Sequence, residues 1–191
     1  MNIRLYAVKL DRPLSEAERS TLARFLPPER QDRIKTSEPL CACALLCRAL
    51  HELYGLEDLP QLSCGEHGKP YFASHPDVHF SLSHTRGAAL LAVHNEPIGV
   101  DIECLRPVSG AMRTRFHAAN DADFWRLWVQ RESRCKRAGI SAVALRDREM
   151  PSFPNERVFA LEPFPDYTTG VCTCSDADVD KPIYLTVKEL I

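Results

Sequence analysis

The alternation of apolar and polar side chains predicts a group of strands near the middle of the chain. Residues 78–84 alternate, as in a half-buried strand, whereas residues 88–93 are continuously apolar, as in a strand buried on both faces. A short turn then leads into a further apolar stretch at 98–103. We therefore expect a three-stranded meander over these segments, and an earlier strand at residues 3–10.

Capping patterns predict where the first two helices begin and end. Ser15, with Glu18 three residues later, forms a capping box that would open a helix running to about Phe25. Ser37 would cap a second helix over residues 38–53, whose residues are apolar nearly all round. A helix of that composition is expected to lie buried at the centre of the fold.

A third helix is predicted over residues 121–138, with Asn120 as its N-cap and Gly139 just past its end. Glu132 and Lys136 are four residues apart and therefore share one face of this helix. A Glu placed four residues before a Lys is also the favoured arrangement of an ordinary surface ion pair. The spacing alone does not decide whether the two side chains form such a surface pair or serve together in a functional site.

The remaining sequence indicates a mixed α+β protein. Residues beyond 150 are proline-rich at first, and segments 170–174 and 182–187 then have the composition of strands. A weak similarity between the stretches around 86–93 and 169–174 favours two related lobes.

Composition is that of an ordinary globular protein and excludes several classes of function. The 191 residues carry a formal net charge of −2, so no basic field favours nucleic acid as a partner. The chain has no apolar run near 18 residues and its N-terminus lacks the apolar core of a signal peptide, so we expect a cytoplasmic protein outside the membrane. Eight cysteines are present without a CxxC pair, which favours reduced thiols that pack as small apolar groups.

The segment Ile98–Glu103 combines an apolar strand with two acids. Asp101 and Glu103 are two residues apart, so on a strand both carboxylates point to the same face. Like charges this close repel unless a cation lies between them, and Mg²⁺ is commonly held by one or two carboxylates together with substrate phosphates. The alternative is a strand end whose acids simply face water.

Four short stretches in a fixed order resemble one known family. They are Gly68-Lys69-Pro70, Phe80-Ser81-Leu82-Ser83-His84, Gly99-Val100-Asp101-Ile102-Glu103 and Trp128-Val129-Gln130-Arg131-Glu132-Ser133-Arg134-Cys135-Lys136. Together they resemble the motifs of the 4′-phosphopantetheinyl transferase superfamily, of the surfactin-synthetase-activating type. Each motif alone is weak, whereas all four in this order over about residues 30–140 are specific.

The resemblance implies a reaction and the residues that carry it out. The serine hydroxyl of an acyl- or peptidyl-carrier protein would attack the β-phosphate of coenzyme A, so that phosphopantetheine is transferred and 3′,5′-ADP leaves. This is the activity of a holo-acyl-carrier-protein synthase. By match to the family motifs, Asp101, Glu103 and Glu132 would hold Mg²⁺. Glu132 would also act as the base for the serine, and Lys136 would stabilise charge on the pyrophosphate.

The resemblance also implies a substrate site and a fold. Lys69, Ser83 and His84 would bind the phosphates of coenzyme A, and Arg30 or Arg33 would reach the nucleotide 3′-phosphate. The expected fold is a pair of related α+β lobes, residues 1–97 and residues 98–191, that form a pseudodimer within one chain. We therefore expect a monomer with coenzyme A in the cleft between the lobes.

The chain departs from the family pattern at the start of its second helix and after Glu103. The basic residue that usually opens this helix is absent, and Glu38 or Pro39 stands near its position. The small glycine inside the helix is replaced by Cys43, and the segment from Glu103 to Glu132 is shorter than in the family. Two alternatives follow, namely a catalytically impaired relative that only binds coenzyme A or a carrier protein, and an interaction protein whose charges are ordinary surface features.

Overall fold

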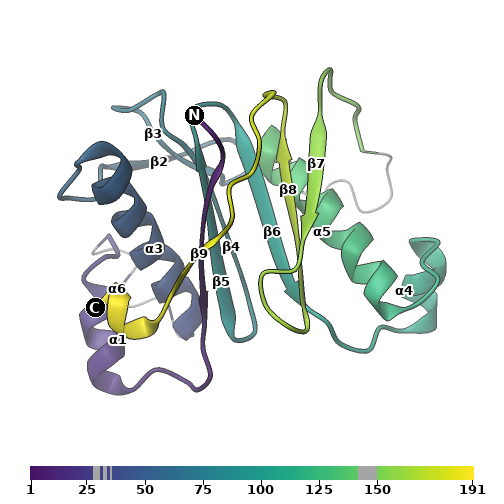
Figure 1. Ribbon diagram of the computed structural model, residues 1–191, viewed down its shortest axis with the longest axis horizontal. Coiled ribbons are helices and arrows are strands. Elements are labelled where there is room, and N and C mark those ends of the chain that lie inside the picture. Colours follow the sequence, from purple (N-terminus) through teal and green to yellow (C-terminus); the bar gives the residue numbers. More distant parts are fainter. Residues whose placement is uncertain (28–30, 32–33, 35, 142–149) are drawn as a thin grey trace.

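The computed structural model describes residues 1–27, 31, 34, 36–141 and 150–191, and it is a mixed α+β structure, as the sequence predicts (Figure 1). In chain order the elements are β1 (Arg4–Lys9), α1 (Glu16–Ala23), α3 (Ser37–Tyr54), β2 (Leu62–Cys64), β3 (Pro70–Phe72), β4 (His79–Thr85), β5 (Ala88–His94), β6 (Ile98–Cys104), α4 (Gly110–Arg115), α5 (Asp121–Ala138), β7 (Arg157–Leu161), β8 (Tyr167–Thr173), β9 (Ile183–Leu185) and α6 (Val187–Leu190).

In the part of the chain that the structure describes, the strands form two main sheets and one small sheet of two strands. The first sheet has the order β4-β5-β1-β9, the second has the order β6-β8-β7, and β2 pairs with β3. Among the strands of the described residues, the pairings are antiparallel except that of β9, which lies parallel to β1. The C-terminal segment therefore returns to the first sheet, beside α1 and α3 (Figure 1).

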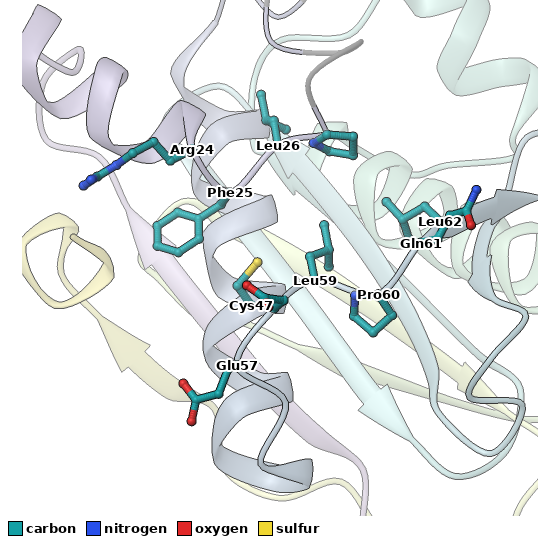
Figure 2. A pocket seen from close by; sticks show the side chains of 11 residues that line it. Arg24, Phe25, Leu26, Cys47, Glu57, Leu59, Pro60, Gln61 and Leu62 are labelled. Carbon is teal, nitrogen blue, oxygen red and sulfur yellow. The ribbon is translucent and has the colours of Figure 1, made fainter.

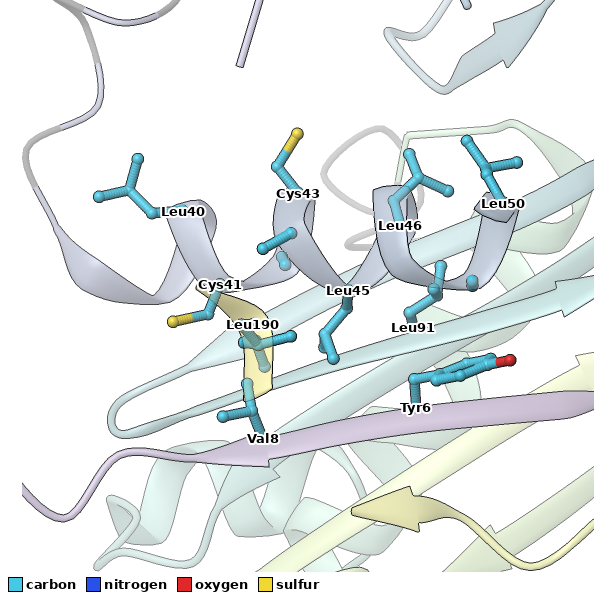
Figure 3. Close-up of a cluster of buried hydrophobic side chains, with 14 of the residues drawn as sticks. Tyr6, Val8, Leu40, Cys41, Cys43, Leu45, Leu46, Leu50, Leu91 and Leu190 are labelled. Atoms are coloured by element: carbon cyan, nitrogen blue, oxygen red, sulfur yellow. The ribbon is translucent and has the colours of Figure 1, made fainter. Parts of the chain in front are cut away.

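The first sheet is buried on both faces, and this explains the continuous apolar run of β5. On one face, α3 packs its leucines against side chains that include Tyr6, Val8 and Leu91 (Figure 3). On the other face, the intervening residues Leu5 and Leu90 belong to a second core shared with β6 and β8. Cysteines in α3 pack in the first core as small apolar groups, as predicted.

The second sheet is covered by α5, which approaches its backbone unusually closely. A Cβ added at Gly99 in β6 would lie only 1.9 Å from the carbonyl oxygen of Ser133. A Cβ added at Gly170 in β8 would lie 2.5 Å from the carbonyl oxygen of Val129. Two neighbouring strands thus present bare backbone to the helix, and this contact fixes the distance between α5 and β6.

The predicted three-stranded meander is wrong at its third strand. β4 and β5 pair as expected, but β6 belongs to the second sheet, where it pairs with β8. The reason is that β5 already pairs on both edges, with β4 and with β1, so its backbone groups are taken. β6 instead lies beside β4, and we call this contact between residues 79–85 and 98–104 the β4–β6 seam.

The helix limits largely follow the capping patterns. The capping box at Ser15 is present, and Gly55 and Gly139 end their helices with positive φ, which favours glycine. The predicted cap at Ser37 is wrong, because Thr36 is the N-cap and Ser37 is already helical, its hydroxyl accepting from the backbone of Leu14.

The later part of the chain differs more from the prediction. Helix α4 and strand β7 fall in stretches with no clear pattern, and the strand predicted over 182–187 ends at Leu185. Thr186 and Glu189 form a capping box there, and it opens the short helix α6.

Candidate active site

Strand β6 carries Asp101 into the β4–β6 seam, where its carboxylate is held from two sides. The side chain of Asp101 is buried, and its Oδ1 accepts hydrogen bonds from the Ser83 hydroxyl at 2.8 Å and from Lys136 Nζ at 2.7 Å. Within the described residues, Oδ2 of Asp101 is buried and has no hydrogen-bond partner. A buried carboxylate oxygen without a partner is costly, and it is the kind of group that a bound ion would satisfy.

Glu103 lies on the same face of β6, two residues further along. Its Oε2 accepts from the Thr85 hydroxyl at 2.8 Å and from Arg106 Nη1 at 3.0 Å. The prediction that the two strand acids share one face is confirmed, and Asp101 does not face water.

Helix α5 brings Lys136 onto the strand acids. Its ammonium group donates to Asp101, to the Ser83 hydroxyl at 2.9 Å and to the carbonyl oxygen of Leu82 at 3.5 Å. These contacts use the three protons of the group. Lys136 is therefore paired with an acid 35 residues away on a strand. A surface ion pair with Glu132, which the helix spacing also allowed, would not need this contact.

Glu132 belongs to the same electrostatic cluster. Burial raises the pKa of its carboxyl, the negative charge of Asp101 raises it further, and Lys136 opposes the shift. Glu103 adds to the rise. A half-buried carboxyl that lies near two other acids is expected to be harder to ionise, and one nearby lysine offsets this only in part.

Lys69 and His84 flank this cluster. Lys69 Nζ donates to the carbonyl oxygens of Ile98 at 2.9 Å and Arg137 at 3.4 Å, so it ties the loop before β3 to the second sheet. Burial lowers the pKa of Lys69 to about 8, with a further contribution from the nearby charge of Arg137. His84 is exposed at the end of β4, and its pKa is lowered by partial burial of the ring and then by Lys136.

A cavity of about 230 Å³ opens beside the cluster. Among its lining residues are Lys69, Lys136 and Ser81. A larger hollow, of about 700 Å³, lies away from the acids, between the end of α1, the outer face of α3 and the loop at 57–62 (Figure 2). Its lining includes none of the residues that the sequence predicts to be functional, so we place the chemistry at the seam.

Two of the predicted residues, Arg30 and Arg33, lie outside the described residues. Glu38, which stands near the position of the missing basic residue, accepts a hydrogen bond from the backbone of Gly87 at 3.0 Å. Gly87 lies in the turn between β4 and β5 with a positive φ of 74°, and its hydrogen bond to Glu38 holds this turn in place.

Curated proteins similar to this chain are phosphopantetheinyl transferases. A 4′-phosphopantetheinyl transferase of Bacillus subtilis is 31% identical over 159 residues, which are 72% of this chain and 70% of that protein. The chain belongs to the 4′-phosphopantetheinyl transferase family. The transferase Sfp of Bacillus subtilis strain 168 is 29% identical over 158 residues, with the same two coverages. The transferase AcpT of Salmonella typhi is 30% identical over 137 residues, which are 62% of this chain and 68% of AcpT. No family model matches the chain.

The donor set of this transferase suits a hard cation, although it does not form a complete metal shell. In the described part of the chain, no three His, Cys, Asp or Glu side chains are gathered closely enough to hold a metal by themselves. Mg²⁺ needs only one or two carboxylates when substrate phosphates supply further oxygens. Asp101 and Glu103 are two carboxylates of the kind that could serve in this way, and Asp101 Oδ2 has no hydrogen-bond partner among the described residues.

Sequence reasoning missed two residues of the candidate site, Thr85 and Arg106, both of which contact Glu103. A signal for Thr85 was present, because Ser81, Ser83 and Thr85 alternate along one strand and must share a face.

None of the helices in the described ranges is both long and apolar enough to cross a membrane.

Proposed function

We propose that this protein transfers the 4′-phosphopantetheine group of coenzyme A to a serine of an acyl- or peptidyl-carrier protein and releases 3′,5′-ADP. The relatives are transferases of this name, and one residue from each of the other three motifs, Lys69, Ser83 and Lys136, donates a hydrogen bond to β6. We assign it to the holo-acyl-carrier-protein synthase type, acting as a monomer in the cytoplasm. The pathway that the carrier protein serves is left open between fatty acid, polyketide and nonribosomal peptide synthesis.

In the proposed chemistry, Glu132 and Lys136 of α5 have different roles. Glu132 accepts the proton of the attacking serine hydroxyl while the new bond forms between the serine oxygen and the β-phosphorus. The bond from this phosphorus to the oxygen that bridges to the α-phosphate breaks, and the electron pair leaves with 3′,5′-ADP. Lys136 donates to the pyrophosphate oxygens, which requires it to exchange part of its present contact with Asp101.

A divalent cation completes the proposed site. Asp101, Glu103 and Glu132 are the residues that would hold Mg²⁺, which would neutralise charge on the pyrophosphate when bound. Support comes from Asp101 Oδ2, which has no hydrogen-bond partner among the described residues, and from the raised pKa of Glu132, which is due first to burial and then to the negative charge of Asp101.

Coenzyme A is proposed to lie between two lobes, residues 1–97 and residues 98–191, arranged as an internal pseudodimer. Lys69 and His84 would contact its phosphates, and Arg30 or Arg33 would reach the 3′-phosphate. The observation that favours a site between lobes is that β4, from the first sheet, supplies hydroxyls to the acids of β6, from the second.

One observation carries the proposal: Lys136 of α5, Ser83 of β4 and Asp101 of β6 meet within hydrogen-bond distance, although they are far apart in sequence. A cation site and a phosphate-binding lysine are the two parts that phosphoryl transfer needs. We assign the cation site to Asp101 and its neighbouring acids and the phosphate-binding role to Lys136, whose Nζ lies 2.7 Å from Asp101 Oδ1.

The test is mass spectrometry of an apo-carrier protein incubated with the purified chain, coenzyme A and Mg²⁺. The proposal predicts a gain of one phosphopantetheine on the carrier serine, release of 3′,5′-ADP, and loss of both when the cation is chelated. A carrier protein that stays unmodified would refute transfer. If coenzyme A with Mg²⁺ still raised the melting temperature, the protein would instead be a non-catalytic binder.

A further inference from the structure

Three hydroxyl side chains of β4 join the two sheets across the β4–β6 seam. Ser81 accepts from the backbone N–H of Val100 at 3.0 Å, and Ser83 accepts from that of Ile102 at 3.2 Å. Thr85 donates to Glu103. The partner numbers rise together, so β4 and β6 run in the same direction and are joined here through side chains. We call Ser81, Ser83 and Thr85 the hydroxyl ladder.

The hydroxyl of Ser83 has no hydrogen-bonding capacity left. It donates its proton to Asp101 Oδ1, and its oxygen accepts from the backbone of Ile102 and from Lys136. A serine hydroxyl has one donor and two acceptor positions, so all three are occupied. While these contacts persist, Ser83 has no proton for a phosphate oxygen, which is the role that the family resemblance gives it.

Thr85 repeats the same arrangement one step along the strands. Its hydroxyl donates to one oxygen of Glu103, as Ser83 does to one oxygen of Asp101. The second oxygen of each acid takes no part in these contacts, and that of Asp101 is buried without a partner among the residues that the structure describes. The ladder thus holds each carboxylate through one oxygen and makes no hydrogen bond to the other oxygen.

We propose that Ser83 and Thr85 are positioning residues, which hold Asp101 and Glu103 so that the remaining oxygen of each is presented to a divalent cation. This inference rests on the proposed function, because it assumes that the strand acids bind the cation. Removing a hydrogen-bond partner of a metal-binding side chain typically lowers metal affinity about 10–100-fold. Loss of either hydroxyl is expected to fall within that range.

The ladder supplies its own matched variants. Thr85→Val keeps the shape of the side chain and removes the hydroxyl, whereas Thr85→Ser keeps the hydroxyl. Ser81→Ala removes a hydroxyl of the same ladder that accepts from a backbone N–H and, within the described residues, bonds to neither acid, and so it reports the cost of weakening the seam itself. Circular dichroism and thermal melting establish that each full-length variant is folded.

The measurement is Mn²⁺ affinity by electron paramagnetic resonance, with coenzyme A present and the carrier protein absent. We expect Thr85→Val to bind Mn²⁺ at least about 10-fold more weakly than the wild type, and Thr85→Ser and Ser81→Ala to stay within about threefold. Ser83→Ala should likewise lose cation affinity. If Ser83 were a phosphate ligand, this variant would instead raise the coenzyme A KM with cation affinity unchanged.

Several results would overturn the positioning role. They are wild-type Mn²⁺ affinity in Thr85→Val, an equal loss in Thr85→Ser or Ser81→Ala, and a wild-type protein that binds no Mn²⁺. Transfer by the wild type to an apo-carrier protein is measured in parallel. Wild-type transfer with an unchanged Thr85→Val affinity would refute the ladder alone, whereas absence of wild-type transfer would refute the proposed function.

Discussion

The contact between β6 and α5 predicts that Gly99→Ala damages the active site without touching any functional side chain. The added Cβ would lie 1.9 Å from the carbonyl oxygen of Ser133 and 2.3 Å from the backbone nitrogen of Arg137. Ordinary contact begins near 3.4 Å, so the helix backbone must retreat by about 1.5 Å. Both neighbours are backbone atoms of one helix, so no side-chain rotation relieves the clash.

The retreat would carry Glu132 and Lys136 away from β6, because both lie on α5. Overpacking of this kind costs about 1–3 kcal/mol of stability. Displacement of catalytic groups by about 1 Å can cost about 10²-fold in rate. The Lys136–Asp101 contact, now 2.7 Å, is the first that would lengthen.

The assay is urea unfolding together with kcat/KM for transfer to an apo-carrier protein. Gly110→Ala is the matched control, since an added Cβ there meets nothing within 4 Å and the residue lies in a helix. We expect Gly99→Ala to remain folded, to lose about 1–3 kcal/mol and to transfer about 10²-fold more slowly, whereas the control keeps both properties. Wild-type stability and rate in Gly99→Ala would refute the close approach of helix and strand.

Two further predictions concern pH, and one concerns a helix cap. Burial raises the pKa of Cys41 and Cys172 to about 12 from 9.0, so each contributes stability that is present below pH 9 and lost as the pH rises towards 12. Urea unfolding under reductant should show that Cys41→Ala reduces the loss between pH 8 and pH 10 by about 1 kcal/mol, and an unchanged loss would contradict this. Burial lowers the pKa of Lys69 to about 8 from 10.5. Between these pH values the folded state releases the proton that the unfolded state still holds, so Lys69 destabilises the folded protein less as the pH rises. The stability of Lys69→Met relative to wild type should therefore fall by about 2 kcal/mol from pH 7 to pH 10, and a constant difference would rule out the shift. Ser15→Ala should cost about 0.5–2 kcal/mol in urea unfolding, since it removes the capping box of α1, and no loss would show that this cap is not stabilising.

The helices could be predicted because their signals are local. The capping box at Ser15, the left-handed glycines after α3 and α5, and the apolar surface of α3 each depend on a few neighbouring residues. The same holds for Asp101 and Glu103, whose spacing on a strand places them on one face. These elements needed no knowledge of the rest of the chain.

The sheet change at β6 could not be predicted because it depends on which edges are already paired. An apolar strand after a tight turn ordinarily pairs with its predecessor, but β5 is taken on both sides, and β1 lies some 80 residues earlier. The hydroxyl ladder depends on the same topology. The alternation of Ser81, Ser83 and Thr85 is visible in the sequence, but their partners on β6 are not.

The family resemblance selected the residues of the candidate site but not their contacts. It pointed to Ser83 as a phosphate ligand, whereas the hydroxyl is occupied by Asp101, Lys136 and a backbone N–H. It also left open whether Glu132 and Lys136 form a surface pair. The ion pair between Lys136 and Asp101 favours an active-site role, because it joins the helix to the strand acids.

The most direct test of the central claim is the kcat/KM of Glu132→Gln for phosphopantetheine transfer to an apo-carrier protein, followed by mass spectrometry. The substitution keeps size and polarity but removes the negative charge and the proton acceptor. Glu162→Gln, at an exposed position, serves as the matched control. The account predicts a folded Glu132→Gln protein that transfers at least about 100-fold more slowly than wild type, with the control unchanged. A Glu132→Gln protein that keeps more than about a tenth of the wild-type kcat/KM would contradict the assignment of Glu132 as base and cation ligand.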